Sequence, residues 1–97
     1  MKKEVITILL VDDHHMILEG YKNVISKAKF EDYDIVVETA NNCDTAWDLL
    51  NEKEFDIVFL DINFPVQKDS KILSGEDLGI KIKKELPEVK IIILTVL

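Results

Sequence analysis

The sequence predicts a doubly wound α/β fold, in which helices cover both faces of a parallel sheet. Four short apolar runs alternate with three helical segments along the 97 residues. Helices of about 9–15 residues between strands are typical of right-handed crossovers, which connect parallel strands. Three of the runs end on an oxygen-bearing side chain, and parallel strands present their carboxyl ends at the same edge of a sheet. We therefore expect the chemistry of the domain at that edge.

Size and charge restrict the classes of function. A chain of this length forms one domain, which buries only about 60–65% of the surface that the unfolded chain exposes. The net charge of −7, with twelve Lys and no Arg, opposes direct binding to nucleic acid or to an anionic membrane. The single cysteine, Cys43, cannot form an internal disulfide, which fits the cytoplasm, and no export signal or membrane span is readable.

The first half of the chain predicts two strands and two helices. Residues 5–11 are apolar and rich in β-branched side chains, which suits a strand that is buried on both faces. A helix begins near Asp13 or His14, because apolar side chains then recur every three or four residues; they are Ile17, Leu18, Tyr21, Val24, Ile25 and Ala28. Residues 35–39 form a second strand after a polar turn that contains Glu31, Asp32 and Asp34. A short helix around residues 46–50 follows, with Asn42 or Asp44 available to cap it.

The second half predicts two further strands around a third helix. Residues 57–60 form the third strand, and residues 90–96 form the fourth. The apolar positions of the helix between them are spaced by four residues, at Leu78, Ile82 and Leu86. Ser74 and Asp77 match a capping box at the start of this helix, and Pro87 stops it.

The strand ends carry the candidate chemistry. Asp12 and Asp13 follow the first strand, Asp61 follows the third, and Thr95 lies in the last apolar run. Three carboxylates close together repel one another unless a cation lies among them, and oxygen ligands of this kind select Mg²⁺. Taken alone, the Asp12-Asp13 pair is more often a helix cap in a solvated turn; together with Asp61 and Thr95 it predicts a phosphoryl site.

Within that site we expect different roles for the four residues. Asp61 stands alone at its strand end and is the candidate nucleophile, whereas the Asp12-Asp13 pair resembles a platform for the metal. Thr95 can donate a hydrogen bond to a phosphoryl oxygen. His14 and His15 lie close by in the sequence, but we expect them to be solvent-exposed residues at the start of a helix and not ligands.

These motifs together resemble the receiver domain of two-component response regulators. The resemblance covers essentially the whole chain. The matching segments are residues 8–14 (ILLVDDH), residues 56–65 (DIVFLDINFP), Gly75 before an apolar helix, and residues 91–95 (IIILT). The start at residues 12–14 with Glu19-Gly20 is similar to receivers that precede helix-turn-helix DNA-binding domains.

The resemblance implies a flavodoxin-like fold with strand order 2-1-3-4 and a function in signalling without enzymatic turnover. Asp61 is implied to accept a phosphoryl group from a histidine kinase or a phosphotransfer protein. The implied Mg²⁺ ligands are Asp12, Asp13, Asp61 and the backbone carbonyl of Asn63. Thr95 is implied to be the switch residue, whose hydroxyl reorients toward the phosphoryl group. A DNA-binding output domain outside residues 1–97 is a further implied partner in function.

Two departures from the family pattern shape the expectations. Pro65 and Gly75 are ten residues apart, whereas receivers usually place this Gly about four residues after the Pro, so the segment Val66 to Ser74 contains an insertion beside the site.

The family also continues beyond the hydroxyl residue with a helix, a fifth strand that carries an essential Lys, and a last helix. Because these elements do not follow Thr95 here, we expect a C-terminally incomplete receiver with impaired output that self-associates through its exposed fourth strand.

Two other functions compete with this interpretation. Phosphatases of the haloacid-dehalogenase type also begin with an Asp nucleophile at a strand end, but they need a second Asp two residues later, where this chain has Asn63. An inert receiver-like fragment used for protein contact is the structural alternative. It predicts that Asp61→Asn changes neither Mg²⁺ binding nor the response to beryllofluoride, which mimics a phosphoryl group.

Overall fold

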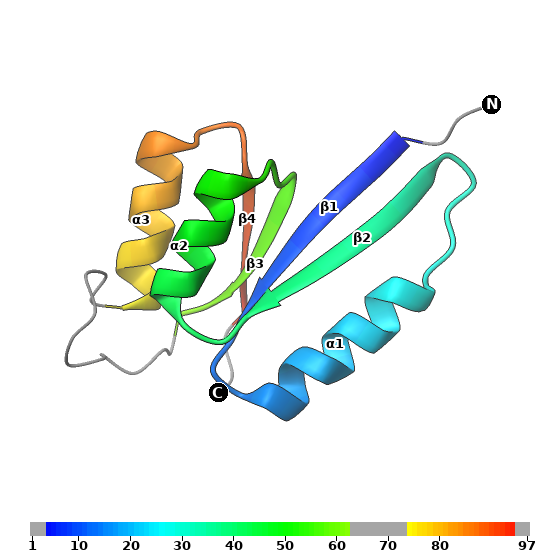
Figure 1. Cartoon of the computed structure of the whole chain (residues 1–97), viewed down its shortest axis with the longest axis horizontal. Coiled ribbons are helices and arrows are strands. Elements are labelled where there is room, and N and C mark those ends of the chain that lie inside the picture. The colour runs from blue at the N-terminus through cyan, green and yellow to red at the C-terminus, as the bar shows by residue number, and fades with distance from the viewer. Residues whose placement is uncertain (1–3, 63–73, 95–97) are drawn as a thin grey trace.

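The computed structural model describes residues 4–62 and 74–94 of the chain. Strands and helices alternate along these residues, as the sequence predicts (Figure 1). The elements are β1 (Glu4–Val11), α1 (His15–Lys27), β2 (Tyr33–Ala40), α2 (Cys43–Glu52), β3 (Ile57–Asp61), α3 (Gly75–Glu85) and β4 (Lys90–Leu94). Asn63, Thr95 and most of the insertion, residues 66–73, lie outside the described residues.

The four strands form one parallel sheet in the order β2-β1-β3-β4, which confirms the predicted fold class and strand order. β1 pairs with β2 along its whole length, from Glu4 to Val11. Its pairing with β3 covers only the second half, from Ile8 to Val11. The carboxyl half of β1 is therefore held on both sides, whereas its first three residues pair with β2 alone.

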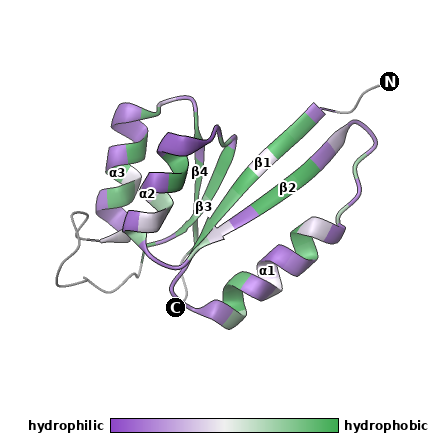
Figure 2. Cartoon of the chain, viewed as in Figure 1, coloured by the Kyte–Doolittle hydropathy of each residue, from purple (hydrophilic) through white to green (hydrophobic). Residues whose placement is uncertain are grey.

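Alternate residues of the central strands fill two apolar layers, because successive side chains of a strand point to opposite faces. Leu9 and Val11 of β1 pack with Val58 and Leu60 of β3 beneath α2 and α3. Ile8 and Leu10 pack with Leu18 of α1 on the other face. Hydropathy follows this arrangement, with nearly continuous hydrophobic strands and helices of mixed character (Figure 2).

Side-chain caps fix the starts of α2 and α3. Of the two candidate caps for α2, Asn42 is the one used, because its Oδ1 accepts a hydrogen bond from the amide of Thr45 at 2.7 Å. Ser74 Oγ accepts a hydrogen bond from the amide of Asp77 at 3.1 Å and donates one to the carboxylate of Asp77 at 3.0 Å. The Ser74 cap is thus confirmed, although the Asp77 carboxylate contacts the Ser74 hydroxyl where a capping box has the backbone amide. α3 ends at Glu85, two residues before Pro87.

Two expectations need correction. β2 begins at Tyr33, so Asp34 belongs to the strand and not to the preceding turn; its partner in the sheet is Val5. The apolar positions of α1 are also less buried than an amphipathic stripe suggests. Leu18 is buried, but Tyr21 and Val24 are 43% and 72% exposed, because no described helix stands beside α1 on its face of the sheet (Figure 1).

β4 is an edge strand in the described part of the chain, since β3 is its one neighbour there. Ile92 and Ile93 of this strand point to opposite faces and are 41% and 47% exposed. An edge strand with exposed apolar side chains is a surface on which another strand can pair.

Candidate functional site: an acidic cluster at the carboxyl edge of the sheet

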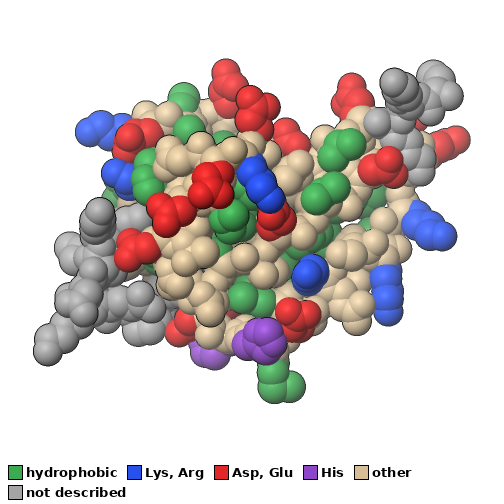
Figure 3. Space-filling model, viewed as in Figure 1, with side chains coloured by type: hydrophobic (Ala, Val, Ile, Leu, Met, Phe, Trp, Pro, Cys, Tyr) green, Lys and Arg blue, Asp and Glu red, His purple; other side chains and the backbone are tan. Residues whose placement is uncertain are grey.

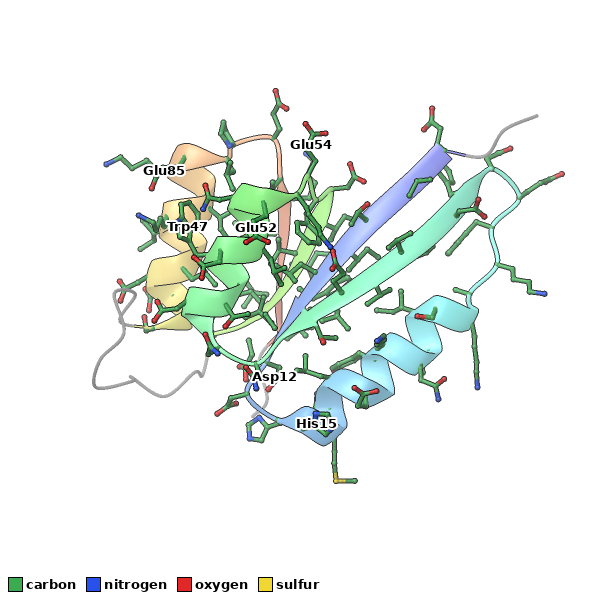
Figure 4. The ribbon with its side chains drawn as sticks, in the orientation of Figure 1. Asp12, His15, Trp47, Glu52, Glu54 and Glu85 are labelled. Carbon is green, nitrogen blue, oxygen red and sulfur yellow. The ribbon has the colours of Figure 1, made fainter. Side chains whose placement is uncertain are left out.

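Strand geometry places two of the predicted carboxylates at neighbouring strand ends. Asp12 follows the last residue of β1, and its backbone amide donates to the carbonyl oxygen of Ala40 at 3.1 Å, which continues the hydrogen bonding between β1 and β2. Asp61 is the last residue of β3. Both side chains lie in the interior, because the residues are only 4% and 3% exposed. Figure 4 shows Asp12 where the strands converge, close to the start of α1.

Four residues bring candidate ligand atoms together at this edge. One atom each from Asp12, Asp13, His14 and Asp61 lies within 4.8 Å of the corresponding atom of every other member. The expected convergence of Asp12, Asp13 and Asp61 is therefore observed, although the last of them is 48 positions further along the chain than Asp13. We call these four residues the acidic cluster.

Local hydrogen bonds shape the first part of the acidic cluster. The backbone amide of His14 donates to Asp12 Oδ1 at 2.9 Å, which folds the turn between β1 and α1. The imidazole Nδ1 of His14 lies 2.9 Å from Asp12 Oδ1 and 3.0 Å from Asp13 Oδ1. The hydrogen bond with Asp12 and the negative charge of Asp13 raise the pKa of His14 above 6.5.

His14 is the member of the acidic cluster that sequence reasoning missed. It takes the N-cap position of α1, as expected, and its side chain is 62% exposed, but its ring is bonded to the carboxylates. The sequence feature that indicates this contact is the position of His14 two residues after Asp12 at a strand end, where a tight turn can bring the two side chains together. The neighbouring His15 is exposed, and Figure 3 shows the histidine side chains together at the lower edge of the molecule.

The donor set of the acidic cluster fits a hard divalent cation. Asp12, Asp13 and Asp61 supply carboxylate oxygens, which are the ligands that Mg²⁺ prefers. Asp13 is partly open to solvent, with 28% of its side chain exposed, whereas Asp12 and Asp61 are buried. A cation at this place offsets the repulsion of buried carboxylates and keeps access to water on one side.

A cavity of about 440 Å³ adjoins the two buried carboxylates. Asp12 and Asp61 form its polar end, and the rest of the wall is mainly apolar; the other lining residues are Ile17, Gly20, Tyr21, Val24 and Leu94. The cavity lies on the α1 face of the sheet, since four of its lining residues belong to α1. The carboxylates therefore have room beside them for a small group.

The fold and the acidic cluster define an α/β domain with carboxylates at the carboxyl edge of a parallel sheet, between the ends of β1 and β3. Residues 8–97 match the response regulator receiver domain. The chain belongs to this family, and it is a receiver domain of two-component signalling.

Curated relatives and solved structures agree with this assignment. The response regulator protein VraR of Staphylococcus epidermidis is 32% identical over 90 residues, which cover 93% of this chain and 39% of VraR. The transcriptional regulatory protein LnrK of Bacillus subtilis is 34% identical over 90 residues, with coverage of 93% and 37%. This chain thus spans well under half the length of either relative.

The crystal structure of the response regulator protein TrrA from Thermotoga maritima, in complex with Mg²⁺ and BeF, superposes with a TM-score of 0.74. The two sequences are 33% identical, and the match covers 93% of this chain and 69% of TrrA. No helix in residues 4–62 and 74–94 has the length and apolar character needed to cross a membrane.

Proposed function

We propose that Asp61 accepts a phosphoryl group from a phosphohistidine of a histidine kinase or a phosphotransfer protein. The observation that carries this proposal is the burial of the Asp61 carboxylate at a strand end, with its oxygen within 4.8 Å of ligand atoms of Asp12 and Asp13. A carboxylate oxygen of Asp61 attacks the phosphorus, one P–O bond forms, one P–N bond breaks, and the departing imidazole keeps the electron pair. The product is an aspartyl phosphate.

Asp12, Asp13 and Asp61 are the residues that would hold Mg²⁺, and the backbone carbonyl of Asn63 would be a further ligand. The ion supplies charge neutralisation for the incoming phosphoryl group. Asp12 is oriented for this role by the turn in which the amide of His14 binds its Oδ1. The TrrA complex with Mg²⁺ and BeF supports the choice of metal, since BeF occurs there together with the ion.

The Thr95 hydroxyl would donate a hydrogen bond to a phosphoryl oxygen, and its reorientation would couple phosphorylation of Asp61 to a conformational change at the protein surface. This role rests on the resemblance to the family. Transcription regulation is the proposed output, through a DNA-binding domain that residues 1–97 do not contain, because LnrK is a transcriptional regulator. The site would act in the cytoplasm and would take up one phosphoryl group without sustained turnover.

The proposal is tested by the intact mass of the protein after incubation with acetyl phosphate and Mg²⁺. We expect the wild type to gain the mass of one phosphoryl group and Asp61→Asn to gain none. Asp48→Asn is the matched control, because Asp48 is an exposed carboxylate of α2 and the charge change is the same. Labelling of Asp61→Asn, or no labelling of the wild type, would overturn the proposal, and sustained hydrolysis of small phosphate esters would favour a phosphatase.

We also propose that the 97-residue chain by itself self-associates through β4. The support is the edge position of this strand and the exposure of Ile92 and Ile93. Sedimentation velocity should show a dimer of the chain that Ile92→Lys converts to a monomer. A wild-type chain that sediments as a monomer at high concentration would contradict self-association and leave phosphoryl acceptance unaffected.

A further inference from the structure

Two glycines of α3 lie against β3. A Cβ atom added to Gly75 would overlap with the backbone oxygen of Asp61, and it would lie 3.0 Å from Cα of Ile62. A Cβ atom added to Gly79, one turn later, would lie 3.3 Å from Cδ2 of Leu60. Gly75 meets backbone, whereas Gly79 meets only the terminal methyl group of a side chain, which needs to shift by a few tenths of an ångström. The first residue of α3 thus comes closer to the strand than a residue with a side chain can.

Neither partner of the Gly75 contact can easily move away. The oxygen belongs to Asp61, whose strand is paired with β1 and β4 on its two sides. The helix is fixed by Leu78 and Ile82, which are fully buried in the core, and by the Ser74 cap at its start. A side chain at position 75 would therefore displace either the start of α3 or the backbone that carries the Asp61 carboxylate.

We propose that Gly75 is a positioning residue for phosphoryl acceptance, because its bare Cα lets α3 lie against the Asp61 backbone and so keeps the Asp61 carboxylate beside Asp12 and Asp13. The inference deepens the proposed function and depends on it for its chemical consequence. Gly75 would contact neither the metal nor the phosphoryl group, and its effect would come from the position of the Asp61 backbone.

The same contact closes the segment between β3 and α3. Gly75 lies 13 positions after Ile62 in the sequence, yet the backbones of the two residues are neighbours. The start of α3 therefore lies against the end of β3, although the chain carries its insertion between them.

The test compares Gly75→Ala with Gly79→Ala, which adds the same methyl group to the same helix. Circular dichroism first establishes a temperature at which both variants are folded. We expect Gly75→Ala to bind Mg²⁺ at least about tenfold more weakly in calorimetric titration and to be labelled correspondingly more slowly by acetyl phosphate. Gly79→Ala should stay within about twofold of the wild type in both measurements.

A second readout separates positioning from stability. In two-dimensional amide NMR spectra of the metal-free proteins, Gly75→Ala should shift the signals of Asp12 and Asp61, and Gly79→Ala should leave them in place. If Gly75→Ala lowers only the unfolding temperature while folded protein binds Mg²⁺ like the wild type, the positioning role is wrong. If the wild type itself neither binds Mg²⁺ nor is labelled, the proposed function fails, and the NMR shifts alone decide whether Gly75 positions Asp61.

A shortened chain tests the inference in case Gly75→Ala does not fold. Deletion of residues 66–71 places Gly75 four residues after Pro65 and keeps the glycine contact. We expect this variant to retain Mg²⁺ affinity within about twofold, because the two ends of the segment already meet. A tenfold loss of affinity in the folded deletion variant would overturn the proposal that the Gly75 contact, and not the segment, positions Asp61.

Discussion

Substitution of Asp61 by Asn should reverse the order of stability between variant and wild type when Mg²⁺ is added. The oxygen of Asp61 lies within 4.8 Å of ligand atoms of Asp12 and Asp13. At that separation two unit charges repel by about 3.5 kcal/mol at an effective dielectric constant of 20, and by about 0.9 kcal/mol in water. Because Asp61 is buried but Asp13 is partly exposed, we expect Asp61→Asn to raise the free energy of unfolding by about 1–3 kcal/mol in a metal chelator.

Mg²⁺ should act in the opposite direction. At a hundred times its dissociation constant, a ligand that binds only the folded state stabilises it by about 2.7 kcal/mol. The wild type should gain this amount, whereas Asp61→Asn, which lacks one of the buried carboxylates, should gain less than about 0.5 kcal/mol at the same Mg²⁺ concentration. Asp61 accounts for both effects, because the charge that destabilises the metal-free protein is the charge that binds the ion.

The assay is urea unfolding at pH 8, followed by circular dichroism in EDTA and in Mg²⁺. Asp48→Asn is the control, since it removes one charge from the exposed surface of α2 and should change the free energy of unfolding by less than about 0.5 kcal/mol in either buffer. An Asp61→Asn variant that is less stable than the wild type in EDTA, or an equal stabilisation of both proteins by Mg²⁺, would contradict charge repulsion and metal binding at Asp61.

Three further predictions concern the scaffold around the site. Leu78→Ala should cost about 2–5 kcal/mol in urea unfolding, because Leu78 is fully buried, and a loss below about 1 kcal/mol would contradict tight packing of α3. Asn42→Ala should cost about 0.5–2 kcal/mol in the same assay, since the amide of Thr45 loses its acceptor; an unchanged midpoint would show that the cap contributes nothing. Burial, followed by the charge of Asp44, raises the pKa of Cys43 from 9.0 to about 11. The thiol should therefore be alkylated far more slowly in native protein at pH 8 than in urea, and equal alkylation rates would contradict its burial. The free energy of unfolding should fall as the pH rises from about 9 to 11, because the thiol ionises in the unfolded chain before it ionises in the folded protein.

Much of the fold could be predicted because local and long-range signals agree. The central strands β1 and β3 are nearly continuous apolar runs, as strands covered on both faces require, and the caps at Asn42 and Ser74 mark where two helices begin. The convergence of Asp12 and Asp61 also follows from the sequence, because parallel strands present their carboxyl ends at one edge. Their roles as ligand and phosphoryl acceptor remain proposals.

The missed features depend on the shape of a turn or on how separate segments pack. Contact of the His14 ring with two carboxylates requires the turn after β1 to adopt one particular shape, which residue types alone do not fix. The exposure of Val24 depends on what stands beside α1, and helical periodicity carries no information about that. Gly75 matches a pattern of the family, but its close approach to Asp61 depends on how α3 packs against β3.

Local stability differs between the two ends of β1, because the strand is paired on both sides only in its carboxyl half. Residues 4–6 are bonded to β2 alone, and Val5 and Tyr33 of this two-stranded extension are 58% and 40% exposed. Segments with few buried contacts open first in native proteins. Amide hydrogens near the amino end of β1 should thus exchange with solvent long before those of residues 8–11, so that fluctuations at one end of the strand leave the carboxylates at the other end undisturbed.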